Sequence, residues 1–173
     1  MLERCGVEAV QVKTPKEVTD VDGLIIPGGE SLTVGKLLGR FGVDKAILER
    51  VKQGMPVFGT CTGMILMAKG IEGSDQPRLG LMDITVRRNA FGRQVDSFET
   101  DLKVPEVGDK PMRAIFIRAP IVTETHDGVE TLAEVDGVTV LVRQSKLLAA
   151  AFHPELTDDC RMHKLFIEMV KSG

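Results

Sequence analysis

The chain contains no tryptophan and no tyrosine, and aromatic residues make up only 4% of it. Those two side chains are the usual stacking surfaces of nucleic-acid and carbohydrate sites, so their absence argues against both ligands. The charge balance points the same way, because 22 basic and 25 acidic side chains leave a formal net charge of −3. Such a chain has no overall positive field to attract nucleic acid or an anionic membrane surface.

Long apolar runs are also absent. None approaches the roughly 18 residues that a membrane-spanning helix needs, and residues 1–6 lack the apolar core of a signal peptide. The three cysteines, Cys5, Cys61 and Cys160, are odd in number and irregularly spaced, which indicates neither a disulfide framework nor a zinc site. We therefore expect a cytoplasmic protein that binds no nucleic acid, no membrane, no metal and no cofactor.

The 173 residues, 43% of them hydrophobic, suffice for a single domain with a buried core, which we expect to span residues 1–173. The first half alternates predicted strands (7–12, 22–26 and 55–58) with predicted helices (32–38, 44–52 and 64–69). The second half is mainly strands, before a last helix capped by Asp158 or Asp159; these strands are 84–88, 95–102, 112–117, 121–125, 130–135, 138–144 and 147–152. This order predicts an α/β fold of three layers, with an open, mainly parallel sheet and an antiparallel insertion.

Cys61 is the strongest candidate for a reactive group. It lies within residues 59–63, Gly-Thr-Cys-Thr-Gly, between a predicted strand and a predicted helix. Such a turn holds a nucleophile in a strained backbone conformation, and the flanking glycines allow strand and helix to approach closely. The helix N-terminus also favours the thiolate. A buried structural cysteine is the competing interpretation, and the downstream His-Pro-Glu at residues 153–155 favours the nucleophile.

His153 and Glu155 are the candidate base and the carboxylate that orients it. They follow the apolar strand predicted over residues 147–152, and they are two residues apart in extended chain, so their side chains leave the same face. Glu155 can therefore hold the imidazole while His153 faces Cys61, which is the arrangement that a cysteine nucleophile requires. The remaining histidines lack such a setting, and we expect them on the surface: His126 and His163.

Acyl transfer also needs hydrogen-bond donors for the oxyanion that forms. The turn at Gly28-Gly29, the double-glycine turn, can direct a backbone N–H into the site, and we assign Gly29 as one donor. The N–H of Thr62, the residue after the nucleophile, is the natural second donor. Ser31 is expected to cap the helix that follows the turn. Because sites in open α/β sheets form at the carboxyl ends of strands, the turn and the two catalytic segments are expected to converge.

Five motifs together resemble the glutaminase subunit of pyridoxal 5′-phosphate synthase, a family of class I, triad-type glutamine amidotransferases. They run in the expected order through nearly the whole chain: residues 27–31 (PGGES), 59–63 (GTCTG), 88–94 (RNAFGRQ), 116–120 (FIRAP) and 152–155 (FHPE). Residues 88–94 discriminate best, since other glutaminases share the Cys and His-Pro-Glu motifs. The resemblance implies a flavodoxin-like sheet and no cofactor.

The resemblance implies an enzyme that hydrolyses L-glutamine to L-glutamate and ammonia. It implies a partner as well, a (β/α)8-barrel synthase subunit that uses the ammonia to build pyridoxal 5′-phosphate, the vitamin B6 cofactor. In this chain Cys61 would form a γ-glutamyl thioester, and His153 and Glu155 would complete the triad. The implied glutamine pocket carries charges of both signs, which suits a zwitterionic amino acid; it comprises Gly29, Glu30, Ser31, Arg88, Ile117 and Arg118.

Members of this family begin with a strand of the type Ile-Gly-Val-Leu-Ala-Leu-Gln-Gly, followed by a helix that runs into a segment like residues 1–4 of this chain. We therefore expect the first strand of the family fold to be missing here, and residues 1–173 alone to be poorly soluble or weakly active. Two alternative functions stay open. One is a class I glutaminase subunit of a different synthase, and the other is a truncated, non-catalytic binding subunit.

Overall fold

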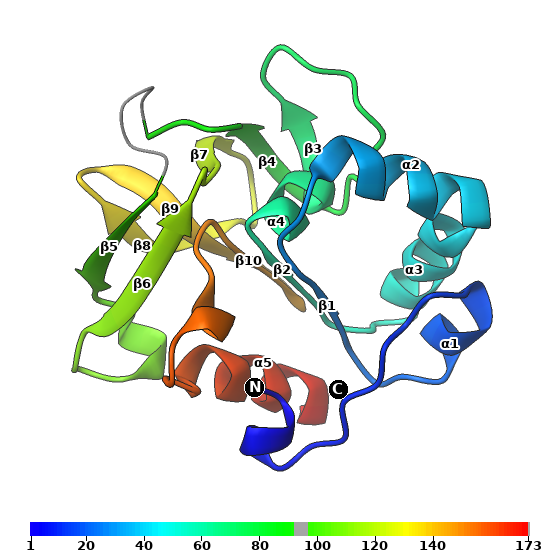
Figure 1. Cartoon of the computed structure of the whole chain (residues 1–173), viewed down its shortest axis with the longest axis horizontal. Helices are drawn as coiled ribbons and strands as arrows, with labels where there is room; N and C mark the ends of the chain where they lie inside the picture. The colour runs from blue at the N-terminus through cyan, green and yellow to red at the C-terminus, as the bar shows by residue number, and fades with distance from the viewer. Residues whose placement is uncertain (92–96, 173) are drawn as a thin grey trace.

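The structure is a computed structural model that describes residues 1–91 and 97–172. Figure 1 shows helices and strands alternating in the first half of the chain and mostly strands in the second half. The helices of the described residues are α1 (Pro15–Thr19), α2 (Ser31–Phe41), α3 (Val43–Lys52), α4 (Thr62–Met67) and α5 (Arg161–Lys171), with 3-10 turns η1 (Glu3–Cys5), η2 (Pro105–Val107) and η3 (Pro154–Leu156). The strands are β1 (Leu24–Ile26), β2 (Val57–Thr60), β3 (Ala68–Ile71), β4 (Met82–Arg87), β5 (Ser97–Leu102), β6 (Met112–Ile117), β7 (Ile121–Thr125), β8 (Glu130–Val135), β9 (Val138–Gln144) and β10 (Leu147–Ala150).

The main sheet of the described chain has eight strands, in the order β1-β2-β10-β9-β7-β4-β3, with β8 also paired to β9. Strands β1, β2 and β10 run parallel, and so do β3 and β4. The remaining pairs are antiparallel, and β5 and β6 form a separate antiparallel ribbon. The predicted α/β fold, with a parallel part followed by antiparallel strands, is confirmed.

The parallel strands place three loops at one edge of the sheet. All four residues of β2 and all four of β10 are buried, as expected for parallel strands covered on both faces. Strand β1 ends just before the double-glycine turn, β2 just before Cys61, and β10 shortly before His153. Since parallel strands have their carboxyl ends on the same side, these three segments meet there.

Helices cover both faces of these strands. In β2, the ring of Phe58 lies 5.8 Å from that of Phe166 in α5. The next residue, Gly59, contacts α4 so closely that a Cβ on it would lie 2.5 Å from the carbonyl carbon of Gly63. Successive residues of a strand point to opposite faces, so α5 and α4 lie on opposite sides of the sheet. Figure 1 shows this layering, with α5 on one side of the strands and α2, α3 and α4 on the other.

The prediction of a strand over residues 7–12 is wrong. Within the described residues no strand precedes Leu24, and the first backbone ladder that the chain makes is that of β1 with β2. A strand forms only where a neighbouring strand takes up its backbone hydrogen bonds. The weak alternation of residues 7–12 reflects no buried face either, because Val10 is 58% exposed.

The other predicted elements are present, mostly with shifted boundaries. The four strands β6, β7, β8 and β9 have the predicted bounds. Helix α1 and strand β3 were missed, and α1 carried a recognisable signal. Thr14 and Glu17 form a reciprocal capping box around Pro15 at the first helical position. No helix within residues 1–91 or 97–172 is long and apolar enough to cross a membrane.

Candidate active site

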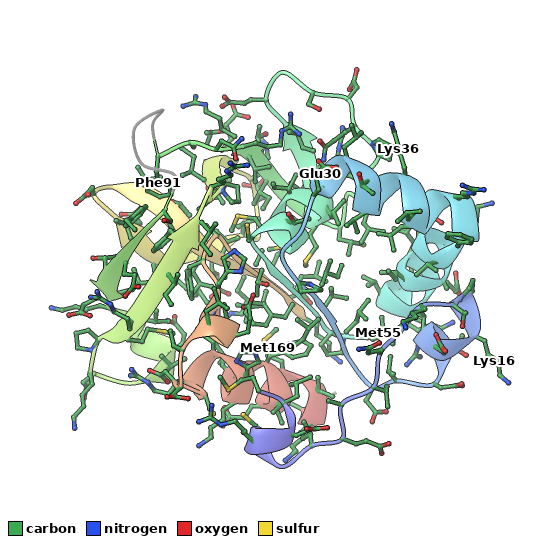
Figure 2. The ribbon with its side chains drawn as sticks, viewed as in Figure 1. Lys16, Glu30, Lys36, Met55, Phe91 and Met169 are labelled. Carbon is green, nitrogen blue, oxygen red and sulfur yellow. The ribbon has the colours of Figure 1, made fainter. Side chains whose placement is uncertain are left out.

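A cavity of about 300 Å³ lies at the carboxyl ends of the parallel strands. Every predicted site residue except Glu155 lines it, together with two residues that were not predicted, Ile65 and Asn89. Glu30 lies at the start of α2, where the helix reaches this edge of the sheet (Figure 2). The lining comprises Gly29, Glu30, Ser31, Cys61, Thr62, Ile65, Arg88, Asn89, Ile117, Arg118 and His153.

Cys61 occupies the turn between β2 and α4 that the sequence predicted. Its backbone has φ 49° and ψ −103°, a conformation that a residue with a Cβ adopts at a cost of about 1–3 kcal/mol. The N–H of Cys61 donates to the carbonyl of Ala150 at 2.8 Å, which fastens the turn to the end of β10. The thiol lies 3.8 Å from the carbonyl oxygen of Ile117. The residue is 8% exposed, so its sulfur is held in a defined place at the cavity wall.

His153 is held by contacts on three sides. Its backbone N–H donates to the carbonyl of Ile115 in β6 at 2.8 Å, and its ring Nδ1 lies 2.8 Å from Oε1 of Glu155. On the third side is the bare Cα of Gly28, where a Cβ would lie 2.5 Å from Cε1 of the imidazole. Glycine at position 28 therefore gives the ring its room, and the ring side chain is only 12% exposed.

The neighbours of the His153 imidazole favour its charged form. Its neighbours Cys61 and then Glu155 raise the pKa of His153 to about 9, against the opposing effect of burial. Burial acts in the other sense on the Glu155 carboxyl, but its hydrogen bonds to His153 and to the backbone outweigh burial and lower its pKa overall. The two shifts favour an ionised carboxylate behind a protonated imidazole. The contact between Glu155 and the imidazole is the one predicted from their spacing.

The two predicted oxyanion donors belong to segments that are hydrogen-bonded to each other. The hydroxyl of Thr62 donates to the carbonyl oxygen of Gly29 at 2.6 Å. This bond joins the double-glycine turn to the first residue of α4, directly beside Cys61. Gly29 and Thr62 therefore line the same wall of the cavity.

Glu30, and not the predicted Ser31, caps α2. Its carboxylate accepts hydrogen bonds from the N–H groups of Leu32 and Thr33 at 3.1 and 2.8 Å, and from the Thr33 hydroxyl at 2.7 Å. The hydroxyl and both N–H groups lower the pKa of Glu30, so it is ionised. The prediction failed because Ser31 is already the first helical residue and is buried, whereas Glu30 has the extended backbone of a cap.

Both predicted arginines reach the cavity from the ends of strands in the second half of the chain. Arg88 follows β4 and Arg118 follows β6. Arg118 has φ 45°, and Asn89 beside Arg88 has φ 50°. With Cys61, three residues of this cavity wall have a positive φ that is unfavourable for side chains other than glycine, as is common at functional sites.

One of the two unpredicted lining residues, Asn89, carried a signal in the sequence. Asn tolerates positive φ better than most residues, and Asn89 follows Arg88 directly in a motif already singled out. The last three residues of that motif, 92–94, lie outside the described residues.

The prediction that His163 is on the surface is wrong. It is 4% exposed and packs its ring edge against Phe58, because it shares a helix face with Phe166 three residues on.

The site has the geometry on which the class of cysteine hydrolases relies: a cysteine on a strained turn, a histidine bonded to a glutamate, and a small cavity that carries charges of both signs. No group of three or more His, Cys, Asp or Glu side chains within residues 1–91 and 97–172 is arranged to hold a metal ion.

Comparisons with known proteins identify the family. The model of the SNO glutamine amidotransferase family matches residues 1–172. A protein of Carboxydothermus hydrogenoformans named "Pyridoxal 5′-phosphate synthase subunit PdxT" is 58% identical over 172 residues, which are 99% of this chain and 90% of that protein. Its namesake in Thermotoga petrophila is 54% identical over 170 residues, with 98% and 90% covered.

A solved structure, "Crystal structure of glutamine amidotransferase", superposes with a TM-score of 0.94 at 47% identity, covering 98% of this chain and 90% of that one. The chain therefore belongs to the SNO glutamine amidotransferase family. The family and the fold class predicted from the five motifs are confirmed, and so is the prediction that the chain is a glutaminase-type enzyme.

Proposed function

We propose that this chain is the glutaminase subunit of a pyridoxal 5′-phosphate synthase. It hydrolyses L-glutamine to L-glutamate and ammonia, and the ammonia passes to a synthase subunit. The observation that carries the proposal is the meeting of Cys61, the charged pair of His153 and Glu155, and the ionic cavity residues in one site. The names of the relatives, which are subunits of that synthase, support the choice among glutaminases.

The chemistry follows from these groups. The Cys61 thiolate attacks the side-chain amide carbon of glutamine, and the N–H groups of Gly29 and Thr62 stabilise the oxyanion. When the C–N bond breaks, the His153 imidazolium gives its proton to the leaving nitrogen, and ammonia departs from a γ-glutamyl thioester. His153 then takes a proton from water, whose hydroxide adds to the thioester carbon. Breaking the C–S bond releases glutamate and restores Cys61.

The same cavity supplies groups that suit the amino-acid end of glutamine. Arg88 and Arg118 are positive and Glu30 is negative, as an α-carboxylate and an α-ammonium group require. Ser31 and Ile117 also line the cavity. A cavity of about 300 Å³ is at the small end of the range for ligand sites, which fits an amino acid rather than a peptide.

The partner in this proposal is a (β/α)8-barrel synthase subunit, and the glutaminase works at a low rate without it. The proposal treats residues 1–173 as one amidotransferase domain and places it in the cytoplasm. All three cysteines are free, which suits a reducing compartment.

A glutamine analogue that carries an electrophile at the side-chain carbon tests the proposal. The chain is incubated with the analogue in the presence and absence of the synthase subunit, and the labelled residue is identified by mass spectrometry. We expect one adduct, on Cys61, whose formation L-glutamine slows. No adduct on Cys61 even with the partner present would support a non-catalytic subunit. Co-purification with a synthase of another kind would support the alternative glutaminase.

A further inference from the structure

Gln76 lies outside the cavity but contacts a residue that lines it. It belongs to the loop between β3 and β4, and its Oε1 accepts a hydrogen bond from Nη1 of Arg88 at 2.8 Å. Only 8% of Gln76 is exposed, although its neighbours Asp75 and Pro77 are both exposed. The hydrogen bond from Arg88 satisfies the oxygen of this buried side-chain amide.

The contact also fixes which way the amide faces. An arginine has only donors, so the carboxamide must turn its oxygen toward Arg88. The nitrogen Nε2 is then buried without a hydrogen-bond partner among the described residues. Turning the amide over would set its donors against those of the guanidinium, so the orientation holds in spite of the unpaired nitrogen.

The loop that carries Gln76 is hydrogen-bonded to helix α4. The N–H of Leu79 donates to the carbonyl of Leu66 in α4 at 2.7 Å. Helix α4 is the helix that begins directly after Cys61. Gln76 therefore connects the long side chain of Arg88 to the element that positions the nucleophile.

We propose that Gln76 is a positioning residue for glutamine binding, whose neutral carboxamide holds the Arg88 guanidinium at the cavity and leaves its charge available for the substrate carboxylate. This inference rests on the proposed function. A carboxylate at position 76 would hold Arg88 as firmly but would neutralise it. An apolar side chain would release Arg88, which would then lose conformational freedom on each binding event. Only a neutral acceptor meets both requirements.

Two variants separate these requirements. Gln76→Met removes the hydrogen-bond acceptor but keeps a side chain of similar length. Gln76→Glu keeps the hydrogen bond to Arg88 but neutralises the guanidinium charge. With the synthase subunit present, we expect either change to raise KM for L-glutamine about tenfold, as for loss of one charge-assisted contact, and to leave kcat within about twofold. The matched control is Gln144→Met, since Oε1 of Gln144 also accepts a partly buried hydrogen bond, from the N–H of Asp83 at 2.8 Å, away from the cavity. The control leaves KM unchanged.

A double-mutant cycle shows whether Gln76 acts through Arg88. In an Arg88→Met background, Gln76→Met should raise KM no further, because the group that it positions is gone. A purely structural role predicts a different pattern, in which Gln76→Glu keeps the normal KM and the Gln76→Met effect persists in the double variant. Should Gln76→Met fail to fold, the isosteric Gln76→Glu decides alone.

The outcomes also separate this inference from the proposed function. Normal KM in a folded Gln76→Glu variant, measured against an active parent chain, overturns the inference and leaves the function intact. If the parent chain with its synthase subunit releases no ammonia from glutamine, the proposed function falls, and the role of Gln76 falls with it.

Discussion

Two parts of the molecule contribute different kinds of groups to one cavity: the parallel part, strands β2 and β10, and a second pair of strands, β4 of the main sheet and β6 of the separate ribbon. The parallel strands β2 and β10, buried along their whole length, lead to Cys61 and His153. The second half of the chain contributes Arg88 and Arg118, which are exposed and follow strands with one face toward solvent. Atoms that form and break bonds need positions fixed to fractions of an ångström, whereas charges that bind a solvated amino acid can stay at the surface until it arrives.

The comparison predicts that the largest loss of rate comes from the parallel part. Cys61→Ser replaces the thiolate by a hydroxyl that is far less acidic, so we expect kcat to fall at least about 1,000-fold. Ammonia release in the presence of the synthase subunit measures the loss. Cys160→Ser is the control and should retain normal activity. Substantial activity in the Cys61→Ser variant would show that Cys61 is not the nucleophile, and the comparison between the two pairs of strands would fail.

Glu155→Gln should give the next largest effect, with a signature in pH. The pKa of His153 is raised to about 9 first by Cys61 and then by Glu155, so removing the carboxylate lowers it. The imidazolium that protonates the leaving nitrogen is then lost at lower pH. We expect kcat to fall about 100-fold and the alkaline limb of kcat/KM to move down from near pH 9. An unmoved alkaline limb would show that Glu155 does not set the charge of His153.

Substitutions of the residues that follow β4 and β6 should act on binding instead. Arg88→Met and Arg118→Met each remove a positive charge from the cavity wall, and we expect KM for glutamine to rise about 10- to 100-fold while kcat changes less. A larger rise for Arg118→Met than for Arg88→Met would assign the α-carboxylate to Arg118 and contradict the role proposed for Gln76. Iodoacetamide, which has no carboxylate, should alkylate Cys61 at an unchanged rate in both. If kcat collapsed and KM held, the division of roles between the two parts would be wrong.

The smallest expected effect concerns backbone strain away from the cavity. Ser145 has φ 54° in the turn between β9 and β10, where it serves no site. Ser145→Gly should stabilise the fold by about 0.5–1 kcal/mol, because glycine adopts this conformation without a Cβ clash. Urea denaturation measures the gain, and activity should not change. A destabilised variant would mean that loss of chain entropy outweighs the relief of strain.

Local patterns predicted what depends on local chemistry. The strands over residues 112–144 had correct bounds because turn residues separate short runs of apolar and β-branched residues. The convergence of Cys61 and His153 was predictable because parallel strands deliver the residues that follow them to one edge, whatever the details of packing. Two failures depend on distant partners: residues 7–12 have no partner strand, and His163 is buried against β2. The failed Ser31 cap and the missed helix α1 are different, because both were decided by neighbouring residues.

The bare Cα of Gly28 beside the His153 ring limits how this site can be altered. The wall against the imidazole is main chain, so no substitution at position 28 can widen the space and every substitution narrows it. The ring therefore cannot be loosened by repacking side chains, nor retuned in small steps from that side. A redesign of this hydrolase for a bulkier amide has to leave this wall in place and enlarge the cavity on the arginine side.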